Sequence, residues 1–214
     1  MFFEKPGIRS TIWLTLLGLF ITLTHFYFYG ILAVLLIVFW VNAFISGSFL
    51  PLPTGKKIFH ALMQLLIPIL TVQLLVFFTD SVTDRPGTPW GFLVFRAYPE
   101  SVFLPLHKPY GLWINSFLNA SYIDWEGIAF MGIFTTLFTF FIIFRSLWLI
   151  VRREWGKILR PFENRWLNLL FWSSFLSLLY SFGVPFVFNL EGLLKYLGPI
   201  KQMRGIARFA WLFY

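Results

Sequence analysis

The sequence predicts an all-α, polytopic membrane protein: a helical bundle with about five complete transmembrane spans and additional interfacial helices. Composition is the first observation, since 58% of the 214 residues are hydrophobic and only 12% are charged, against about 25% in an average soluble domain. Aromatic residues make up 22% of the chain. So much apolar surface excludes a disordered chain. The net charge of +8 does not indicate a nucleic-acid-binding protein, because the basic residues lie between long uncharged runs.

The first spans are predicted from one uncharged run that extends from Ser10 to Gly55. At about 20 residues per span, this run holds two helices. The aromatic cluster beside Gly30 predicts an interfacial turn between them. Pro68 lies inside the next apolar run, where we expect a kink rather than a break, because neighbouring helices can satisfy the freed backbone groups. The spans predicted here are 11–28, 31–49 and 58–79.

The second half of the chain begins with a 47-residue loop at 80–126. Its central part, 92–118, is too apolar for a free loop and too interrupted by proline to span, which predicts helices that lie on the outer leaflet. Arg208–Tyr214 resembles the opening of a sixth span. We therefore expect residues 1–214 to form a single transmembrane module, cut from a longer protein. Two further complete spans are predicted, at 127–151 and 166–188.

The distribution of Lys and Arg predicts a cytoplasmic N-terminus, because cations concentrate in short cytoplasmic segments. The loop 80–126 has three cations and would lie outside. The stretch after the fifth span also carries cations but would lie outside, against this bias. Nine cations fall in the three segments assigned to the cytoplasm: Lys5, Arg9, Lys56, Lys57, Arg152, Arg153, Lys157, Arg160 and Arg165.

Carboxylates at both ends of the external loop are the first candidate site residues. Asp80 and Asp84 are four residues apart, so a helical continuation of the third span would place them on one face. Such a pair can act as a general base or hold Mg²⁺ or Mn²⁺ through oxygen ligands, and Arg85 can bind phosphate. The alternative is that these charges only mark the outer end of a span. Two more acids, Asp124 and Glu126, precede the fourth span and would meet the first pair at the same membrane surface.

A basic face near the C-terminus is the second candidate. Lys201, Arg204 and Arg208 follow one another at intervals of three and four residues, so a helix would present them together. On the outer side this face can bind a lipid phosphate or pyrophosphate. The alternative is a generic anchor for membrane headgroups.

The arrangement resembles the GT-C superfamily of polytopic glycosyltransferases. The similarity lies in the span pattern and in three short stretches: Thr83–Pro86, Trp125–Gly127 and Lys201–Phe209. The resemblance implies a bacterial inner-membrane protein that takes a sugar from a polyprenyl-phosphate donor. It also implies that Asp80 or Asp84 is the catalytic acid residue of an external loop, acting as base or with a metal. Donor phosphate would be held by Arg85, Lys201, Arg204 and Arg208.

A different function class fits the same composition. Twenty-nine Phe and ten Trp also suit a non-catalytic subunit that packs its helices against lipid and other membrane subunits in a larger assembly. The two interpretations differ in one structural feature. An enzyme requires its acids to line a common cavity, whereas a packing subunit does not.

Overall fold

The computed structural model describes residues 6–46, 50–82, 90–118, 123, 125–196, 203 and 205–213. Within these residues every regular element is a helix, as predicted, and there is no strand. The chain divides into two compact units, Met1–Pro86 and Gly87–Tyr214, where the sequence predicts one module. Each unit is therefore described by itself.

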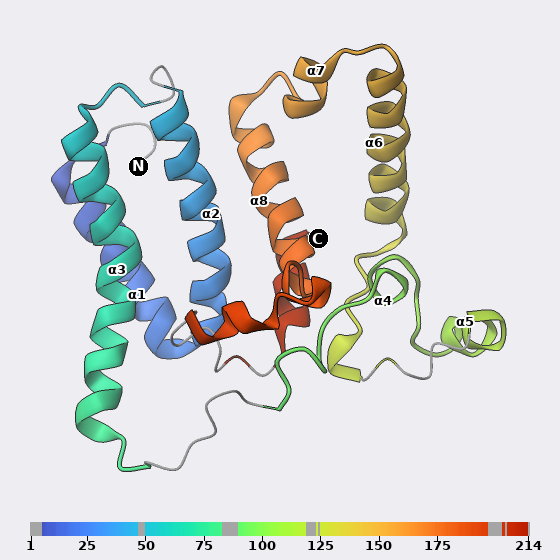
Figure 1. Cartoon of the computed structure of the whole chain (residues 1–214), viewed down its shortest axis with the longest axis horizontal. Helices are drawn as coiled ribbons and strands as arrows, with labels where there is room; N and C mark the ends of the chain where they lie inside the picture. Colours follow the sequence, from blue (N-terminus) through green and yellow to red (C-terminus); the bar gives the residue numbers. More distant parts are fainter. Residues whose placement is uncertain are drawn as a thin grey trace. The chain divides into compact units, whose positions relative to one another are not determined.

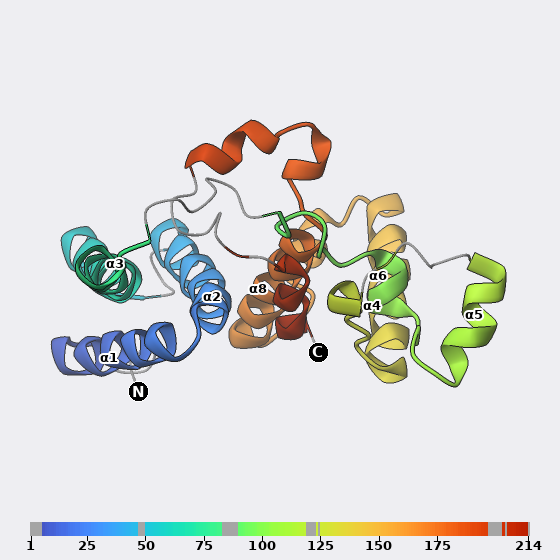
Figure 2. The same cartoon turned by 90° about the horizontal axis from the view of Figure 1, so that it is seen from below.

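The first unit consists of three helices that pack on one another. They are grouped side by side in Figures 1 and 2. α2 and α3 are long and apolar enough to cross a membrane, and α1 is a shorter apolar helix of 17 residues. Their bounds are α1 Ile8–Thr24, α2 Phe26–Ile45 and α3 Thr54–Thr79.

In α1 and α3 of the first unit, burial is inverted relative to a water-soluble bundle, whereas α2 buries apolar side chains such as Leu36 and Phe39. The buried residues of α1 are Thr11, Thr15, Gly18 and Thr22, whereas its large apolar side chains are exposed. The buried face of α3 is also largely polar and includes Gln64. Because large apolar side chains on the outside are stable only in a hydrocarbon environment, this pattern supports a membrane location. The outward-facing apolar residues of α1 are Ile8, Ile12, Trp13, Leu16, Leu17, Phe20 and Leu23.

Pro68 lies within α3 and the helix continues past it, as the sequence predicts. A proline has no N–H to donate to the carbonyl four residues earlier, which here is that of Gln64. The Tyr29 hydroxyl lies 3.4 Å from this carbonyl oxygen and donates to the Leu65 carbonyl at 2.6 Å. Gly18 lets α1 approach the proline closely, since a Cβ there would lie 3.3 Å from Pro68 Cγ. The neighbouring helices thus accommodate the proline.

The boundary between the first two helices differs from the prediction. The turn was expected at the aromatic cluster beside Gly30, with helices at 11–28 and 31–49, but the break falls at His25, whose backbone is extended. Tyr29 explains the shift. Its side chain is buried against α3, so the cluster belongs to the first turn of α2 and is not a turn at the membrane surface.

The second unit is built around α8 and the final 3-10 helix, η6, which pack along each other. Serines of α8 connect the two: Ser177 Oγ donates to the Phe209 carbonyl at 2.6 Å, and Ser174 Oγ donates to the Leu212 carbonyl at 2.8 Å. Because these serines satisfy carbonyl groups of η6, the end of that helix can be buried inside the unit. The segment predicted as the opening of a sixth span is therefore, over its described residues, a packed 3-10 helix. The elements are α6 Ile133–Val151, α7 Trp155–Leu159, α8 Arg165–Ser181, η3 Phe186–Phe188, η4 Glu191–Tyr196 and η6 Ile206–Phe213.

Only part of the five-span prediction is confirmed. Among the described residues, three helices are long and apolar enough to span a membrane: α2, α3 and α6. The predicted fourth span, 127–151, corresponds to α6, which begins later than predicted, at Ile133. The predicted fifth span, 166–188, corresponds to α8, which has 17 residues. α8 is not among the candidate spans, because it is short and because Asn168 and four serines lower its hydropathy. Its serines face the protein, where Ser177 donates a hydrogen bond to a carbonyl of η6.

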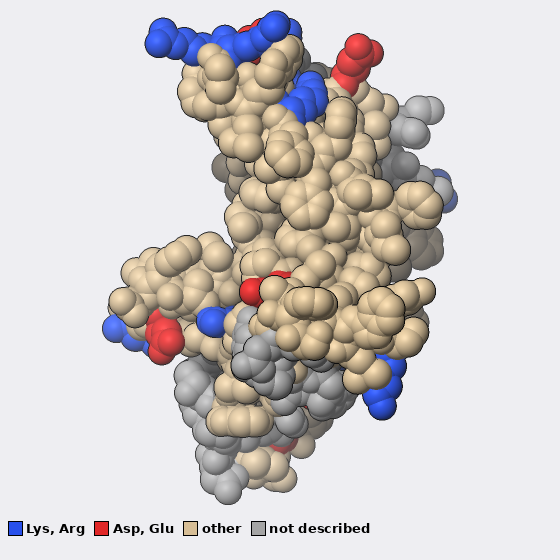
Figure 3. Space-filling model, turned by 90° about the vertical axis from the view of Figure 1, so that its right-hand side faces the viewer, with Lys and Arg blue, Asp and Glu red and all other residues tan. Residues whose placement is uncertain are grey.

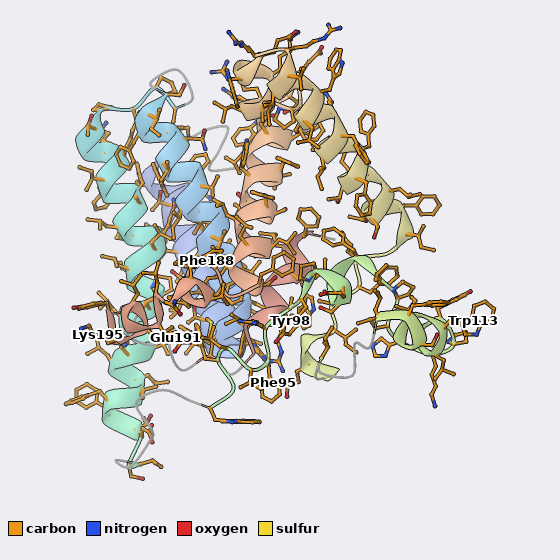
Figure 4. All side chains as sticks on the ribbon, turned by 45° about the vertical axis from the view of Figure 1, so that its right-hand side comes forward. Phe95, Tyr98, Trp113, Phe188, Glu191 and Lys195 are labelled. Carbon is orange, nitrogen blue, oxygen red and sulfur yellow. The ribbon has the colours of Figure 1, made fainter. Side chains whose placement is uncertain are left out.

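The loop stretch 92–118 contains two short helices, α4 Pro99–Phe103 and α5 Tyr110–Leu118, in agreement with the predicted helix pair. α5 lies across the direction of α6 (Figures 1 and 2). Its large side chains are exposed, and Trp113, 79% exposed, points away from the unit (Figure 4). An exposed aromatic helix of this orientation suits a membrane interface.

Candidate functional site

The segment before α4 forms the centre of the second unit. Residues 90–95 are a turn, and the extended residues after it connect two distant elements. The Ala97 N–H donates to the Ser181 carbonyl at the end of α8, at 2.8 Å, and the Phe95 carbonyl accepts from the Ala207 N–H at the start of η6, at 3.1 Å. Phe95 and Tyr98 mark this segment in Figure 4. Phe92 and Phe95 are buried, so the protein itself shields them from the surroundings.

Two glycines allow η2, the 3-10 helix Trp125–Gly127, and η6 to approach this segment. A Cβ on Gly127 would lie 2.8 Å from the Arg96 carbonyl oxygen, a distance that real Cβ atoms do not tolerate. A Cβ on Gly205 would lie 3.2 Å from Glu126 Oε2 and 3.6 Å from Phe95 Cβ. The Glu126 carboxylate is thereby held against the backbone that leads into η6.

A cavity of about 250 Å³ lies where these segments meet. Since a water molecule occupies about 30 Å³ in the liquid, the cavity holds a group of roughly eight water volumes, enough for a phosphate with part of a sugar. Its charged lining residues are Glu126 and Arg208, both half-buried. The lining residues are Glu126, Ile128, Ala129, Ala207, Arg208 and Trp211.

Of the eight residues predicted for the site, the structure brings two together. Glu126 and Arg208 come from segments far apart in the sequence and line the same cavity. Asp80 belongs to the other unit, so nothing places it near them. The remaining five lie outside the described residues, and their assignments stay predictions: Asp84, Arg85, Asp124, Lys201 and Arg204.

Asp80 has a local structural role at the end of α3. Its backbone N–H donates to the Val76 carbonyl at 2.8 Å, and its Oδ1 accepts from the Val82 N–H at 3.1 Å. These bonds close the helix and start the next turn. Within the described part of the chain, no group of three or more His, Cys, Asp or Glu side chains could hold a metal ion. The Mg²⁺ or Mn²⁺ prediction depends on Asp84 and stays untested.

Arg208 is the one described member of the predicted basic face, and the face that it would share with Lys201 and Arg204 stays a prediction. The described residues around Arg208 form a 3-10 helix, in which side chains three apart are aligned. Arg208 is consequently aligned with Trp211, which also lines the cavity. Two carbonyls of this 3-10 helix, those of Phe209 and Leu212, accept hydrogen bonds from serines of α8.

Two further residues were not selected from the sequence: Trp211, which lines the cavity, and Arg96, which lies in the central segment of the unit. Trp211 is one of ten tryptophans, and its place three residues after Arg208 is a signal only once the helix type is known. The guanidinium carbon of Arg96 lies 4.9 Å from the centre of the Tyr98 ring, a cation–π contact. A lone cation in an apolar stretch is the sequence signal that marks it.

Comparison with known families places the whole chain in one of them. The family model that matches residues 1–214 is described as Domain of unknown function (DUF6311). The chain belongs to this family. No curated protein matches it, and no solved structure matches it.

Proposed function

We propose that the chain is a membrane-embedded module of a glycosyltransferase that uses a polyprenyl-phosphate-linked sugar. The observation that carries the proposal is the shared cavity of Glu126 and Arg208. A guanidinium binds phosphate through two parallel, charge-assisted hydrogen bonds. A carboxylate beside it supplies the base that sugar transfer requires. The resemblance to GT-C glycosyltransferases adds the substrate class.

The proposed reaction uses the two groups in different roles. The acceptor hydroxyl oxygen forms a bond to the anomeric carbon of the donor sugar. The bond between that carbon and the phosphate oxygen breaks, and its electron pair leaves with the polyprenyl phosphate, whose charge Arg208 stabilises. The hydroxyl proton passes to the Glu126 carboxylate. Glu126 is assigned as the base because it shares the cavity with Arg208, while Asp80 and Asp84 remain the acids that the family resemblance implies.

Replacing Glu126 with Gln tests this assignment. Membranes that contain the chain are incubated with radiolabelled undecaprenyl-phosphate sugars and an acceptor. We expect Glu126→Gln to lower transfer about 100-fold or more, as loss of a general base does. Binding of undecaprenyl phosphate should be unchanged or tighter, because a negative charge is removed beside Arg208. The control is Glu191→Gln, at an exposed acid of the same unit. No transfer by the unmodified chain, or full transfer by Glu126→Gln, would contradict the proposal.

We also propose that α1 and α8 cross the membrane, which gives five spans with a cytoplasmic N-terminus in a bacterial inner membrane. Each has 17 residues, about 26 Å of helix, close to the 30 Å of a hydrocarbon core. The outward-facing apolar residues of α1 support its insertion. The orientation is supported by the nine cations of the segments assigned to the cytoplasm.

Single cysteines test this topology cleanly, because the chain has none of its own. Ser81, Ser116 and Gly156 are exposed, and a Cβ on Gly156 meets no atom within 4 Å. On intact cells, an impermeant thiol reagent should label cysteine at Ser81 and Ser116 and leave cysteine at Gly156 unlabelled until the membrane is opened. Labelling at Gly156 alone would invert the topology.

A further inference from the structure

A second and larger cavity in the same unit has no part in the proposed sugar transfer. It is a groove of about 690 Å³ whose two sides come from α6 and α8. Volumes of this size are typical of ligand sites. Its lining is overwhelmingly apolar and aromatic. The few hydroxyl groups include Thr139, which donates to the Thr135 carbonyl, and Ser174, which donates to the Leu212 carbonyl. These hydroxyl protons are directed to the protein's own backbone, so the groove suits a hydrocarbon ligand.

One wall of the groove is a helix that is long and apolar enough to cross a membrane. α6 is a candidate span of 19 residues, about 28 Å long, and Thr135, Ile142 and Ser146 of this helix line the groove over several turns. The outer face of α6 is uncharged over most of its length, and charged residues gather at the end that carries α7 (Figure 3). A groove in this position is bathed by lipid chains rather than water.

One end of the groove is formed by the segment that joins α6 to α8. Ile158, Pro161 and Phe162 of this segment line it. Hydrogen bonds fasten the segment to α8. Trp172 Nε1 donates to the Leu159 carbonyl at 2.9 Å, and the Asn168 amide both donates to the Phe162 carbonyl, at 2.6 Å, and accepts from its N–H, at 2.9 Å. This end of the groove is therefore preorganised.

The joining segment is also cationic. Between positions 152 and 165 it carries five cations and two carboxylates. Glu154 forms an ion pair with Lys157, and the close contact with the Lys157 ammonium lowers the pKa of the Glu154 carboxyl below its ordinary value. In the sequence, Arg160 stands between two groove-lining residues, Ile158 and Pro161. Its side chain has no ion pair or hydrogen bond within the described part of the chain.

We propose that this groove binds an anionic phospholipid, with one acyl chain between α6 and α8 and the phosphate beside Arg160. Hydrocarbon lining and excess positive charge occur at the same end of one groove, which matches the two parts of such a lipid. In the topology proposed above, this end faces the cytoplasmic leaflet, where anionic lipids are abundant. The site does not depend on sugar transfer and lies at the opposite end of the unit from the Arg208 cavity.

Native mass spectrometry of the full chain, titrated with phosphatidylglycerol or with phosphatidylcholine of the same acyl chains, tests the proposal. We expect phosphatidylglycerol to bind tenfold or more tightly than phosphatidylcholine. Arg160→Gln should remove most of this preference, and Arg160→Lys should restore part of it. The matched control is Arg9→Gln, which removes an exposed cation from the other unit and should leave the preference intact.

The chain-binding part of the site is tested by filling the groove. Ser146→Trp and Leu167→Trp place an indole in the groove from α6 and from α8, and each should weaken binding of both lipids tenfold or more. Leu167 is exposed, so this variant is expected to fold even if Ser146→Trp does not. The control is Leu137→Trp, on the opposite face of α6 and outside the groove.

Three results would overturn the proposal. The first is equal binding of the two phospholipids, and the second is full binding by a folded groove-filled variant. The third is a dimer of the unmodified chain that Leu167→Trp converts to a monomer, because a second copy would then occupy the groove.

Discussion

Replacing Arg208 with Gln is expected to weaken binding of undecaprenyl phosphate tenfold or more, which corresponds to about 1.4 kcal/mol, and to abolish sugar transfer. Arg208 lines the cavity together with Glu126, and among the described lining residues it is the cation, whose guanidinium can bind a phosphate in bidentate fashion. Charge-assisted hydrogen bonds of this kind are worth about 1.5–3 kcal/mol. Arg208→Lys keeps the charge but loses the planar fork, so an intermediate affinity is expected. Titration of detergent-solubilised protein with labelled undecaprenyl phosphate measures the change.

The control for this variant is Lys195→Gln, which removes an exposed cation from η4 of the same unit. It should leave phosphate binding unchanged. Binding to vesicles of ordinary anionic lipid should be similar for both variants. If Arg208→Gln weakens vesicle binding as much as undecaprenyl phosphate binding, the residue is a general headgroup anchor and the donor-site assignment fails.

Replacing Gln64 with Leu is expected to destabilise the three-helix unit by about 1–3 kcal/mol, the cost of leaving buried partners without a hydrogen bond. Gln64 is only 1% exposed. Its Oε1 accepts from Trp40 Nε1 at 3.1 Å, and its Nε2 lies 3.4 Å from Thr11 Oγ1. The network continues to His60, whose Nδ1 is 2.7 Å from the same hydroxyl. Unfolding of the purified protein in mixed micelles measures the loss.

The matched control for this prediction is Gln73→Leu, the same substitution at an exposed position of α3, which should not destabilise the bundle. Adding Trp40→Phe to Gln64→Leu removes the stranded indole N–H and should recover part of the lost stability, because removal of both partners costs less than removal of one. Equal stability of Gln64→Leu and Gln73→Leu would show that the buried network contributes nothing.

The sequence predicts the helices better than their ends. The span predicted at 58–79 is α3, Thr54–Thr79: its end before Asp80 was predicted, whereas its start follows Pro53, so that Lys56 and Lys57 lie inside the first turn of the helix. The break at His25 carries no such signal. It lies inside an uncharged run and depends on the burial of Tyr29 against α3, which is a tertiary contact. The difference between α8 and the predicted span 166–188 has a similar cause. The serines of α8 lower its hydropathy, and they find hydrogen-bond partners only when η6 packs beside them.

The candidate site was partly predictable for a related reason. Acids and cations at span ends are visible in the sequence, so Glu126 and Arg208 could both be selected. Their meeting could not be derived, because it depends on Gly127 and Gly205 allowing two backbone segments to approach. From the sequence, Asp80 was selected as a catalytic candidate and Glu126 only as a further acid at the same membrane surface. In the structure the Asp80 carboxylate closes the turn after α3, in the other unit.

A double-mutant cycle between Glu126 and Arg208 is the most direct test of the shared cavity. Affinity for undecaprenyl phosphate is measured for the unmodified chain, Glu126→Gln, Arg208→Gln and the double variant. If the two side chains act on one bound phosphate, Glu126→Gln should change binding by a different amount when Arg208 is present than when Gln replaces it. The coupling energy should then exceed about 0.5 kcal/mol, as for residues in contact. Strictly additive effects of the two substitutions would contradict a common site.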